Sequence, residues 1–112
     1  MVVYPKFQVF KSLANSQYYY RLRAVNSEPI LSGEGYTSKQ SCLVAIASVK
    51  ANAPYDFRYE RKNGTANYTF NLKASNGEII GRSENYTTSA ARENGIEAVK
   101  RDAPVAAIED LS

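Results

Sequence analysis

Two copies of a glutamate-x-tyrosine motif could carry chemistry in this chain. Glu34 is followed by Tyr36, and Glu84 by Tyr86. A carboxylate beside a phenol, close to the start of a helix, could hold a small polar ligand or serve a small-ligand enzyme. An asparagine precedes each pair at the same distance. The candidate polar set is Asn26, Glu34, Tyr36, Asn76, Glu84 and Tyr86.

The same residues also have structural interpretations. Asparagine shapes a turn, and Thr37 and Thr87 can each cap a helix that begins just after the tyrosine. A glutamate near a helix N-terminus also suits the helix dipole. Residues that both copies share are those that both need in order to fold, so the pattern favours the structural interpretation.

Aromatic and cationic side chains alternate along one predicted strand. In the stretch 18–25, Tyr18, Tyr20 and Leu22 point to one face, and Tyr19, Arg21 and Arg23 to the other. Aromatic rings among cations on an open sheet could bind single-stranded nucleic acid, because bases stack on rings and cations follow phosphates. The candidate binding face is Phe10, Tyr19, Arg21, Arg23, Arg58, Asn71, Lys73 and Arg82.

A solvated surface, or a face that pairs with another subunit, would show the same alternation. Glu60 interrupts the cationic set, and the net charge is only +3. The sequence therefore favours another protein, or a second copy of this chain, over nucleic acid as the partner of this face.

The composition narrows the chemistry. The chain has no histidine and one cysteine, Cys42, which excludes a histidine-based catalytic relay, an imidazole metal site and an intrachain disulfide. Cys42 falls in the first turns of a predicted helix, and its counterpart Arg92 suggests a surface or boundary position. We expect no cofactor, no metal and no enzymatic activity. The sequence predicts a non-enzymatic binding or interaction module.

The N-terminal residues lack the basic head and apolar run of a signal peptide, and no window approaches twenty apolar residues. We therefore expect a soluble, cytoplasmic protein with no membrane partner.

An internal repeat sets the architecture. Residues 22–54 align without a gap to residues 72–104, and the alignment extends backwards to pair Phe7 with Phe57. Each copy predicts three strands and a helix. The predicted strands are 7–11, 18–25 and 30–32 in the first copy, and 57–61 and 79–82 in the second, where residues 62–67 read as a polar loop. Each helix stops at a proline, Pro54 or Pro104.

The last strand, 105–111, has no third copy to begin, so we place it beside the sheet of the first repeat. The predicted fold is α+β: two tandem β3-α-β repeats form a single antiparallel sheet with both helices on one face, and the C-terminal strands are exchanged between repeats. We expect one domain, 1–112, made of repeats at about 5–54 and 55–104 and the closing strand.

The second copy resembles the YegP-like family of small bacterial proteins. The residues that carry the resemblance are Leu72-Lys-Ala-Ser-Asn-Gly-Glu-Ile-Ile80, Ser83-Glu-Asn-Tyr-Thr87, and Glu93-Asn-Gly-Ile96 through Pro104. The first copy departs from this pattern at Ser27, Gly33 and Leu43-Val-Ala45. The resemblance implies tandem β3-α-β units with exchanged C-terminal strands, and it supplies no activity, catalytic residue or cofactor.

Overall fold

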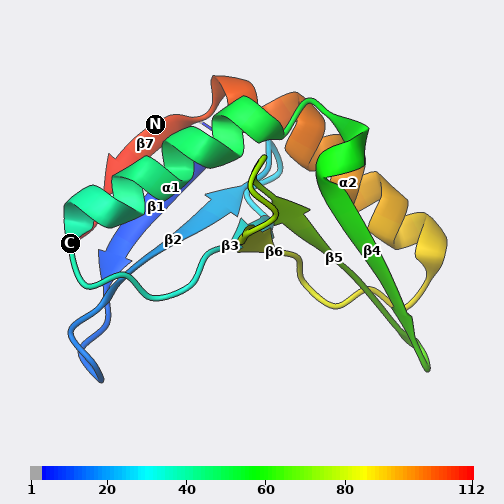
Figure 1. Cartoon of the computed structure of the whole chain (residues 1–112), viewed down its shortest axis with the longest axis horizontal. Helices are drawn as coiled ribbons and strands as arrows, with labels where there is room; N and C mark the ends of the chain where they lie inside the picture. The colour runs from blue at the N-terminus through cyan, green and yellow to red at the C-terminus, as the bar shows by residue number, and fades with distance from the viewer. Residues whose placement is uncertain (1–3) are drawn as a thin grey trace.

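The computed structural model describes residues 4–112; residues 1–3, part of the stretch searched for a signal peptide, lie outside the described residues. Seven strands form one sheet in the order β4-β5-β6-β3-β2-β1-β7. The strands are β1 (Lys6–Lys11), β2 (Tyr18–Arg23), β3 (Pro29–Ser32), β4 (Tyr59–Gly64), β5 (Asn67–Lys73), β6 (Ile79–Arg82) and β7 (Ala107–Asp110), and the helices are α1 (Lys39–Asn52) and α2 (Ser89–Asp102). Both helices cover the same face of the sheet, and the two outer hairpins diverge below them (Figure 1).

The predicted alternation places the core correctly. Phe7 and Val9 of β1 and Tyr20 and Leu22 of β2 are fully buried beneath the helices. Ile46 of α1 joins them, with further apolar residues of both helices, in one cluster that spans the two repeats. Burial of this shared apolar surface supplies the main driving force for folding.

The two repeats meet at the centre of the sheet, where β3 pairs antiparallel with β6 through Ser32 and Arg82. The buried Tyr20 hydroxyl donates a hydrogen bond to the carbonyl of Ile80 in the other repeat. Each helix also packs on the third strand of the opposite repeat, α1 on β6 and α2 on β3. The repeats therefore share one core, as the fold prediction requires.

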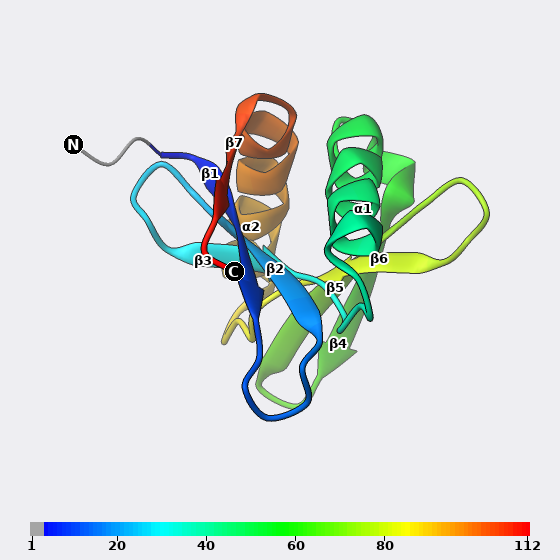
Figure 2. The same ribbon diagram turned by 90° about the vertical axis from the view of Figure 1, so that its left-hand side faces the viewer.

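The last strand lies beside the first repeat, as predicted, but its direction differs from the prediction. β7 pairs with β1 in parallel, with Phe7 opposite Ile108, so the sheet is mostly rather than wholly antiparallel (Figure 2). Two strands joined by a hairpin are antiparallel, whereas strands joined through a helical crossover can pair in parallel. The chain between β1 and β7 contains both helices, so a parallel pairing is possible.

Both helices begin one residue later than predicted. Ser38 Oγ accepts from the Ser41 amide at 3.1 Å, and Thr88 Oγ1 accepts from the Ala91 amide at 3.0 Å. Thr37 and Thr87 are not the caps, because the preceding tyrosines still pair with the sheet: Tyr36 bridges Tyr18. The helices end at Asn52 and Asp102, just before the predicted proline stops.

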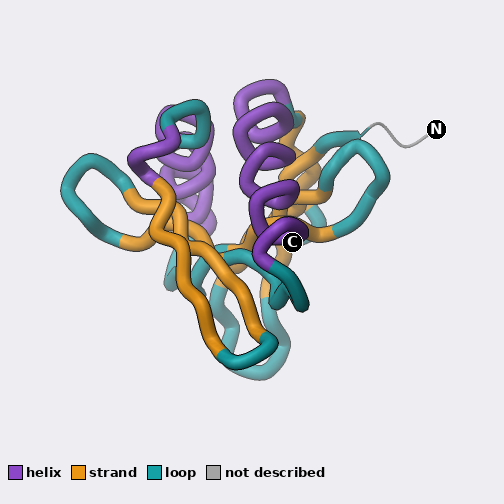
Figure 3. Tube along the Cα trace, turned by 90° about the vertical axis from the view of Figure 1, so that its right-hand side faces the viewer, coloured by secondary structure: helices purple, strands orange, loops and turns teal. Residues whose placement is uncertain are grey.

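The gapless alignment fails at the start of the second repeat. Residues Asp56–Arg58 form a single 3-10 turn, and Phe57 is 73% exposed. Tyr59 lies opposite Leu72 as Phe7 lies opposite Leu22, so the true counterpart of Phe7 is Tyr59. The predicted loop 62–67 is instead a tight hairpin, with β4 running to Gly64 (Figure 3). The first repeat has a longer β1–β2 loop, which accounts for the shift in alignment.

Within residues 4–112, neither helix is long and apolar enough to cross a membrane.

Candidate functional site

A row of polar side chains crosses the open face of the sheet, opposite the helices. Gln8 is paired with Glu109 and Arg21, and Arg21 with Ser32. Across the repeat boundary, Ser32 is paired with Arg82, and the row continues through Asn71 and Glu60. The row therefore brings together Arg21, Asn71 and Arg82 of the predicted binding face.

The first-repeat half of this row holds two guanidinium groups on one neutral amide. Arg21 Nε and Arg23 Nε donate to Gln8 Oε1 at 2.9 and 2.7 Å. The amide nitrogen of Gln8 donates to Glu109 at 2.7 Å, and Lys6 Nζ pairs with the same carboxylate at 2.9 Å. These bonds from Lys6 and Gln8 lower the pKa of Glu109. With Glu109 matched by Lys6, the positive charges of Arg21 and Arg23 are held in place but not cancelled.

The second-repeat half has the same layout with a different charge. Glu60 occupies the position of Gln8, and Asn71 and Lys73 occupy those of Arg21 and Arg23. Asn71 Nδ2 donates to Glu60 at 3.1 Å and Lys73 Nζ at 3.0 Å, and these two bonds lower the pKa of Glu60. Here the single carboxylate of Glu60 faces two lysines, Lys73 at 3.0 Å and the exposed Lys62 at 3.9 Å, so this half has less uncancelled charge to offer a partner than the first half.

The two aromatic residues of the predicted face form a column with an arginine. The rings of Phe10 and Tyr19 stack at 5.8 Å with an interplanar angle of 18°, and the Arg21 guanidinium lies 4.7 Å from the centre of the Phe10 ring. Asn15 Nδ2 donates to the Tyr19 hydroxyl at 2.8 Å. Phe10 therefore contacts both Tyr19 and Arg21, and these contacts help to fix the Arg21 side chain on the open face.

Two cations of the predicted face behave differently from the rest. Arg82 Nη2 pairs with Glu34 at 3.1 Å across the repeat boundary. Arg58 lies outside the row, in the 3-10 turn before β4, with its guanidinium 4.6 Å from the centre of the Phe57 ring. The predicted strand 57–61 therefore begins two residues too early, and Arg58 lies just before the first strand residue, Tyr59.

The asparagines of the candidate polar set shape turns. Asn26 Oδ1 accepts from the Glu28 amide at 3.1 Å, and Asn76 Oδ1 accepts from the Glu78 amide at 3.0 Å. The residue after each asparagine, Ser27 or Gly77, has a positive φ, as a tight connection between two strands often requires. This confirms the turn interpretation of Asn26 and Asn76.

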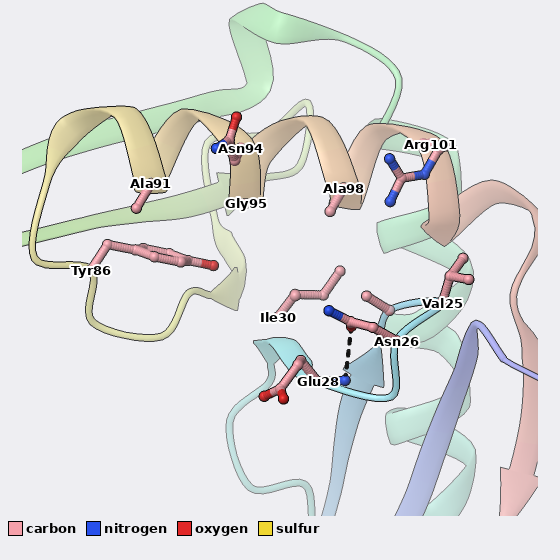
Figure 4. Close-up of a pocket in the computed structure, with 11 residues that line it drawn as sticks. Val25, Asn26, Glu28, Ile30, Tyr86, Ala91, Asn94, Gly95, Ala98 and Arg101 are labelled. Carbon is pink, nitrogen blue, oxygen red and sulfur yellow. Dashed lines mark hydrogen bonds between the residues drawn. The ribbon is translucent and has the colours of Figure 1, made fainter.

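Within the candidate polar set, Tyr86 of the second repeat lies near Asn26 of the first repeat, and not with Glu84 of its own repeat in a common site. Tyr86 lines a cavity of about 380 Å³ together with Asn26 and Glu28, beneath α2 (Figure 4). Glu84 is exposed and does not line it. Burial raises the pKa of Tyr36 and of Tyr86, and the nearby Glu34 and Glu84 add to the two shifts. Both phenols therefore stay protonated at neutral pH.

Cys42 is fully buried, so the expected surface or boundary position was wrong. Burial raises the pKa of its thiol, which disfavours the reactive thiolate. Among residues 4–112, no three histidine, cysteine, aspartate or glutamate side chains gather in a way that could hold a metal ion.

The sequence reasoning missed Gln8, Lys6 and Glu109 on the open face and Arg101 in the cavity. Gln8 could have been found, because it alternates with Phe7 and Val9 and must face the same way as Phe10. Glu109 and Arg101 could not, because their neighbours come from distant parts of the chain.

The comparisons with known proteins agree with the repeat and the fold. The model of the family described as a domain of unknown function (DUF1508) matches residues 14–60 and again residues 65–110. The chain is 44% identical over 61 residues to the UPF0339 protein in the ptx operon 5' region of Stutzerimonas stutzeri, covering 54% of each chain. It is 47% identical over 57 residues to the UPF0339 protein YegP of Yersinia pestis, covering 51% of each. In these matches the chain spans about half the length of the curated relatives.

Two solved structures align over nearly the whole chain. The solution NMR structure of the protein of unknown function yegP from Escherichia coli has a TM-score of 0.89 at 40% identity, covering 99% of this chain and 96% of that one. The solution NMR structure of the UPF0339 protein SO3888 from Shewanella oneidensis has a TM-score of 0.88 at 39% identity, covering 95% and 90%. The predicted YegP-like resemblance is confirmed, and the chain belongs to the DUF1508 family, with one copy of the family's domain in each repeat.

Proposed function

We propose that the protein is a non-catalytic binding module that holds an acidic segment of another protein against the first-repeat half of its open sheet face. The observation that supports this most directly is the arrangement of Arg21 and Arg23 on the neutral Gln8. A partner does not have to order these guanidinium groups itself, which reduces the entropic cost of binding. The Nη1 and Nη2 atoms of Arg21 make no hydrogen bond with any residue in 4–112, and guanidinium nitrogens match a carboxylate well.

An acidic peptide fits this surface better than a single-stranded nucleic acid does. Single-strand binders present ring faces on which successive bases stack. Here Phe10 stacks on Tyr19 and lies 4.7 Å from the Arg21 guanidinium, and both contacts reduce the ring surface left for a base. The surface therefore supplies positive charge with few free stacking platforms.

The arrangement of the repeated Glu/Tyr pairs favours binding over catalysis. Glu34 turns to Arg82, and Glu84 lies outside the cavity that Tyr86 lines. A phenol with a raised pKa also stays protonated at neutral pH, so its basic form is scarcely available. The pairs are thus not assembled as a catalytic unit.

The test is a titration of the labelled 112-residue chain with a peptide of alternating glutamate and serine, at two salt concentrations. We expect saturable binding that weakens with salt. Arg21→Gln should weaken it about tenfold, which corresponds to about 1.4 kcal/mol. Lys39→Gln removes a half-exposed cation on the helix side, next to Asp110, and should leave binding unchanged.

Absence of saturable binding at low salt would refute the proposal, as would an equal effect of Arg21→Gln and Lys39→Gln. A parallel titration with oligothymidylate decides between partners: tighter binding of the oligonucleotide than of the peptide would replace the acidic peptide with nucleic acid. A mass measurement at the titration concentration checks for self-association through the same face, which would contradict a partner of another kind.

A further inference from the structure

We propose that the cavity beneath α2 is a binding site for a small aromatic carboxylate. The cavity has a volume of about 380 Å³ and lies between α2 of the second repeat and the β2–β3 turn of the first. Its volume falls within the usual range of about 300–1,000 Å³ for small-molecule sites. This site is separate from the open sheet face, since both helices lie on the opposite side of the sheet (Figure 1).

Two opposite walls of the cavity are apolar. On α2, Ala91, Gly95 and Ala98 face the cavity, and Ile30 forms the opposite wall (Figure 4). Small residues on the helix leave room for a ligand to lie close to the backbone. An apolar ligand body gains free energy here by leaving water.

Tyr86 gives the cavity a polar group at one end. Its hydroxyl points into the cavity (Figure 4) and makes no hydrogen bond with any residue in 4–112. The ring lies so close to α2 that a Cβ atom on Gly95 would be 2.3 Å from the hydroxyl oxygen, so this placement requires glycine. Since the phenol stays protonated, it can donate to an oxygen of the ligand. Its ring also offers an aromatic ligand a surface to pack against.

Arg101 supplies a fixed hydrogen-bond donor at the other end, where Asp102 already matches its charge. Its Nε and Nη2 donate to the two oxygens of Asp102 at 2.8 and 3.2 Å. Asp102 is 2% exposed, so it anchors the guanidinium firmly, while Nη1 of Arg101 makes no hydrogen bond with any residue in 4–112. Glu28 lies toward the Tyr86 side of the cavity (Figure 4) and repels an anion there. The free Nη1 donor and the repulsion from Glu28 therefore orient a carboxylate toward Arg101 and the apolar body toward Ile30 and Gly95.

The first repeat offers a built-in comparison. Its helix has Ala45 where α2 has Gly95, and Ala51 where α2 has Arg101. At the corresponding place, the tyrosine Tyr36 therefore lacks both the glycine that admits its ring and the cation. We expect one binding site per chain.

The experiment follows the backbone amides of the isotopically labelled protein by NMR while benzoate, phenylacetate or indole-3-acetate is added into the millimolar range. Hexanoate, benzyl alcohol and benzylamine are added in parallel to separate the aromatic and carboxylate contributions. We expect saturable shifts at Ile30, Gly95 and Ala98 with at least one aromatic carboxylate, and weaker binding of all three comparison compounds. Arg101→Gln should weaken binding of the carboxylate about tenfold and leave that of benzyl alcohol unchanged. Tyr86→Phe should weaken binding and Tyr36→Phe should not, with dispersed spectra showing that each variant is folded.

No saturable shift at the cavity with any of the three aromatic carboxylates would overturn the proposal. So would equal binding of benzylamine, or an equal effect of Tyr36→Phe and Tyr86→Phe. Tighter binding of hexanoate than of the aromatic compounds would overturn the aromatic part and assign the cavity to aliphatic carboxylates.

Discussion

The two halves of the open sheet face share one backbone layout but differ in available charge. In the first, Gln8 accepts hydrogen bonds from Arg21 and Arg23 and leaves their charge intact. In the second, Glu60 accepts from Asn71 and Lys73 and neutralises the lysine. An amide and a carboxylate can therefore occupy the same position in a repeat while leaving different amounts of positive charge to attract an acidic partner.

The outer parts of the two repeats differ in a second way. β7 extends the sheet only beside the first repeat, where it pairs with β1. In that repeat, the α1 residue equivalent to Arg92 of α2 is the buried Cys42. The second repeat ends at β4, and there Arg92 of α2 hydrogen-bonds the carbonyl of Lys62 and the side chain of Asn63. Arg92 thus binds the end of the β4–β5 hairpin, whose outer strand β4 has no further strand beside it.

Substituting each of Cys42 and Arg92 by the other residue should have the largest effect on the free energy of unfolding. Cys42→Arg would bury a charge that has no partner in the core, and we expect a loss of about 3–5 kcal/mol in the free energy of unfolding. Arg92→Cys removes the two hydrogen bonds to the hairpin tip and should cost about 1–3 kcal/mol. Urea unfolding of both variants is the measurement. Equal losses from the two substitutions would show that the positions are interchangeable, against this account.

Deleting residues 107–112 tests the strand that only the first repeat has. The deletion keeps the buried Ala106 but removes the ladder to β1, the hydrogen bond from the Leu111 amide to the Val9 carbonyl and the Lys6–Glu109 pair. We expect a loss of about 2–4 kcal/mol from these bonds, together with a tendency to aggregate through the exposed edge of β1. In hydrogen exchange, β1 amides should lose protection while those of β5 keep it. An unchanged melting temperature would show that β7 is dispensable.

Acid should loosen the outer parts of both repeats, with a smaller effect. Hydrogen bonds from Arg61 and Lys100 lower the pKa of Asp56 from 3.8 to about 2, and bonds from Ser112 and Lys39 lower that of Asp110 to about 2. A carboxyl whose pKa is lower in the folded state stabilises the fold above its unfolded value and ceases to do so as the pH falls through the folded value. Stability should therefore decline between about pH 4 and pH 2. The effect should be modest and screened by salt, because both carboxylates are exposed.

Urea midpoints measured across this pH range check the sign, with Asp56→Asn and Asp110→Asn as controls that should flatten the decline. Stability that rises as the pH falls would contradict the assigned ion pairs.

Local patterns in the sequence were enough to predict the strands, the shared core and the outward direction of Arg21, Arg23, Asn71, Lys73 and Arg82. The predicted strand start at Phe57 failed, because a two-residue difference in hairpin length moves the start of β4 to Tyr59. The prediction failed for Cys42, because this residue is buried in the core cluster whatever the polarity of its counterpart. The cavity could not be predicted, since it forms only when α2 crosses onto the β2–β3 turn of the other repeat.

The most direct test of the account exchanges the two residues that set the charge of the open face. Gln8→Glu gives the first half the carboxylate of the second, and Glu60→Gln does the reverse. In titrations with the alternating glutamate–serine peptide at low salt, we predict that Gln8→Glu abolishes saturable binding and that Glu60→Gln preserves or strengthens it, with both variants folded by circular dichroism. Equal binding by the two variants would contradict the claim that the first-repeat half of the face, with its uncancelled Arg21 and Arg23, is the binding surface.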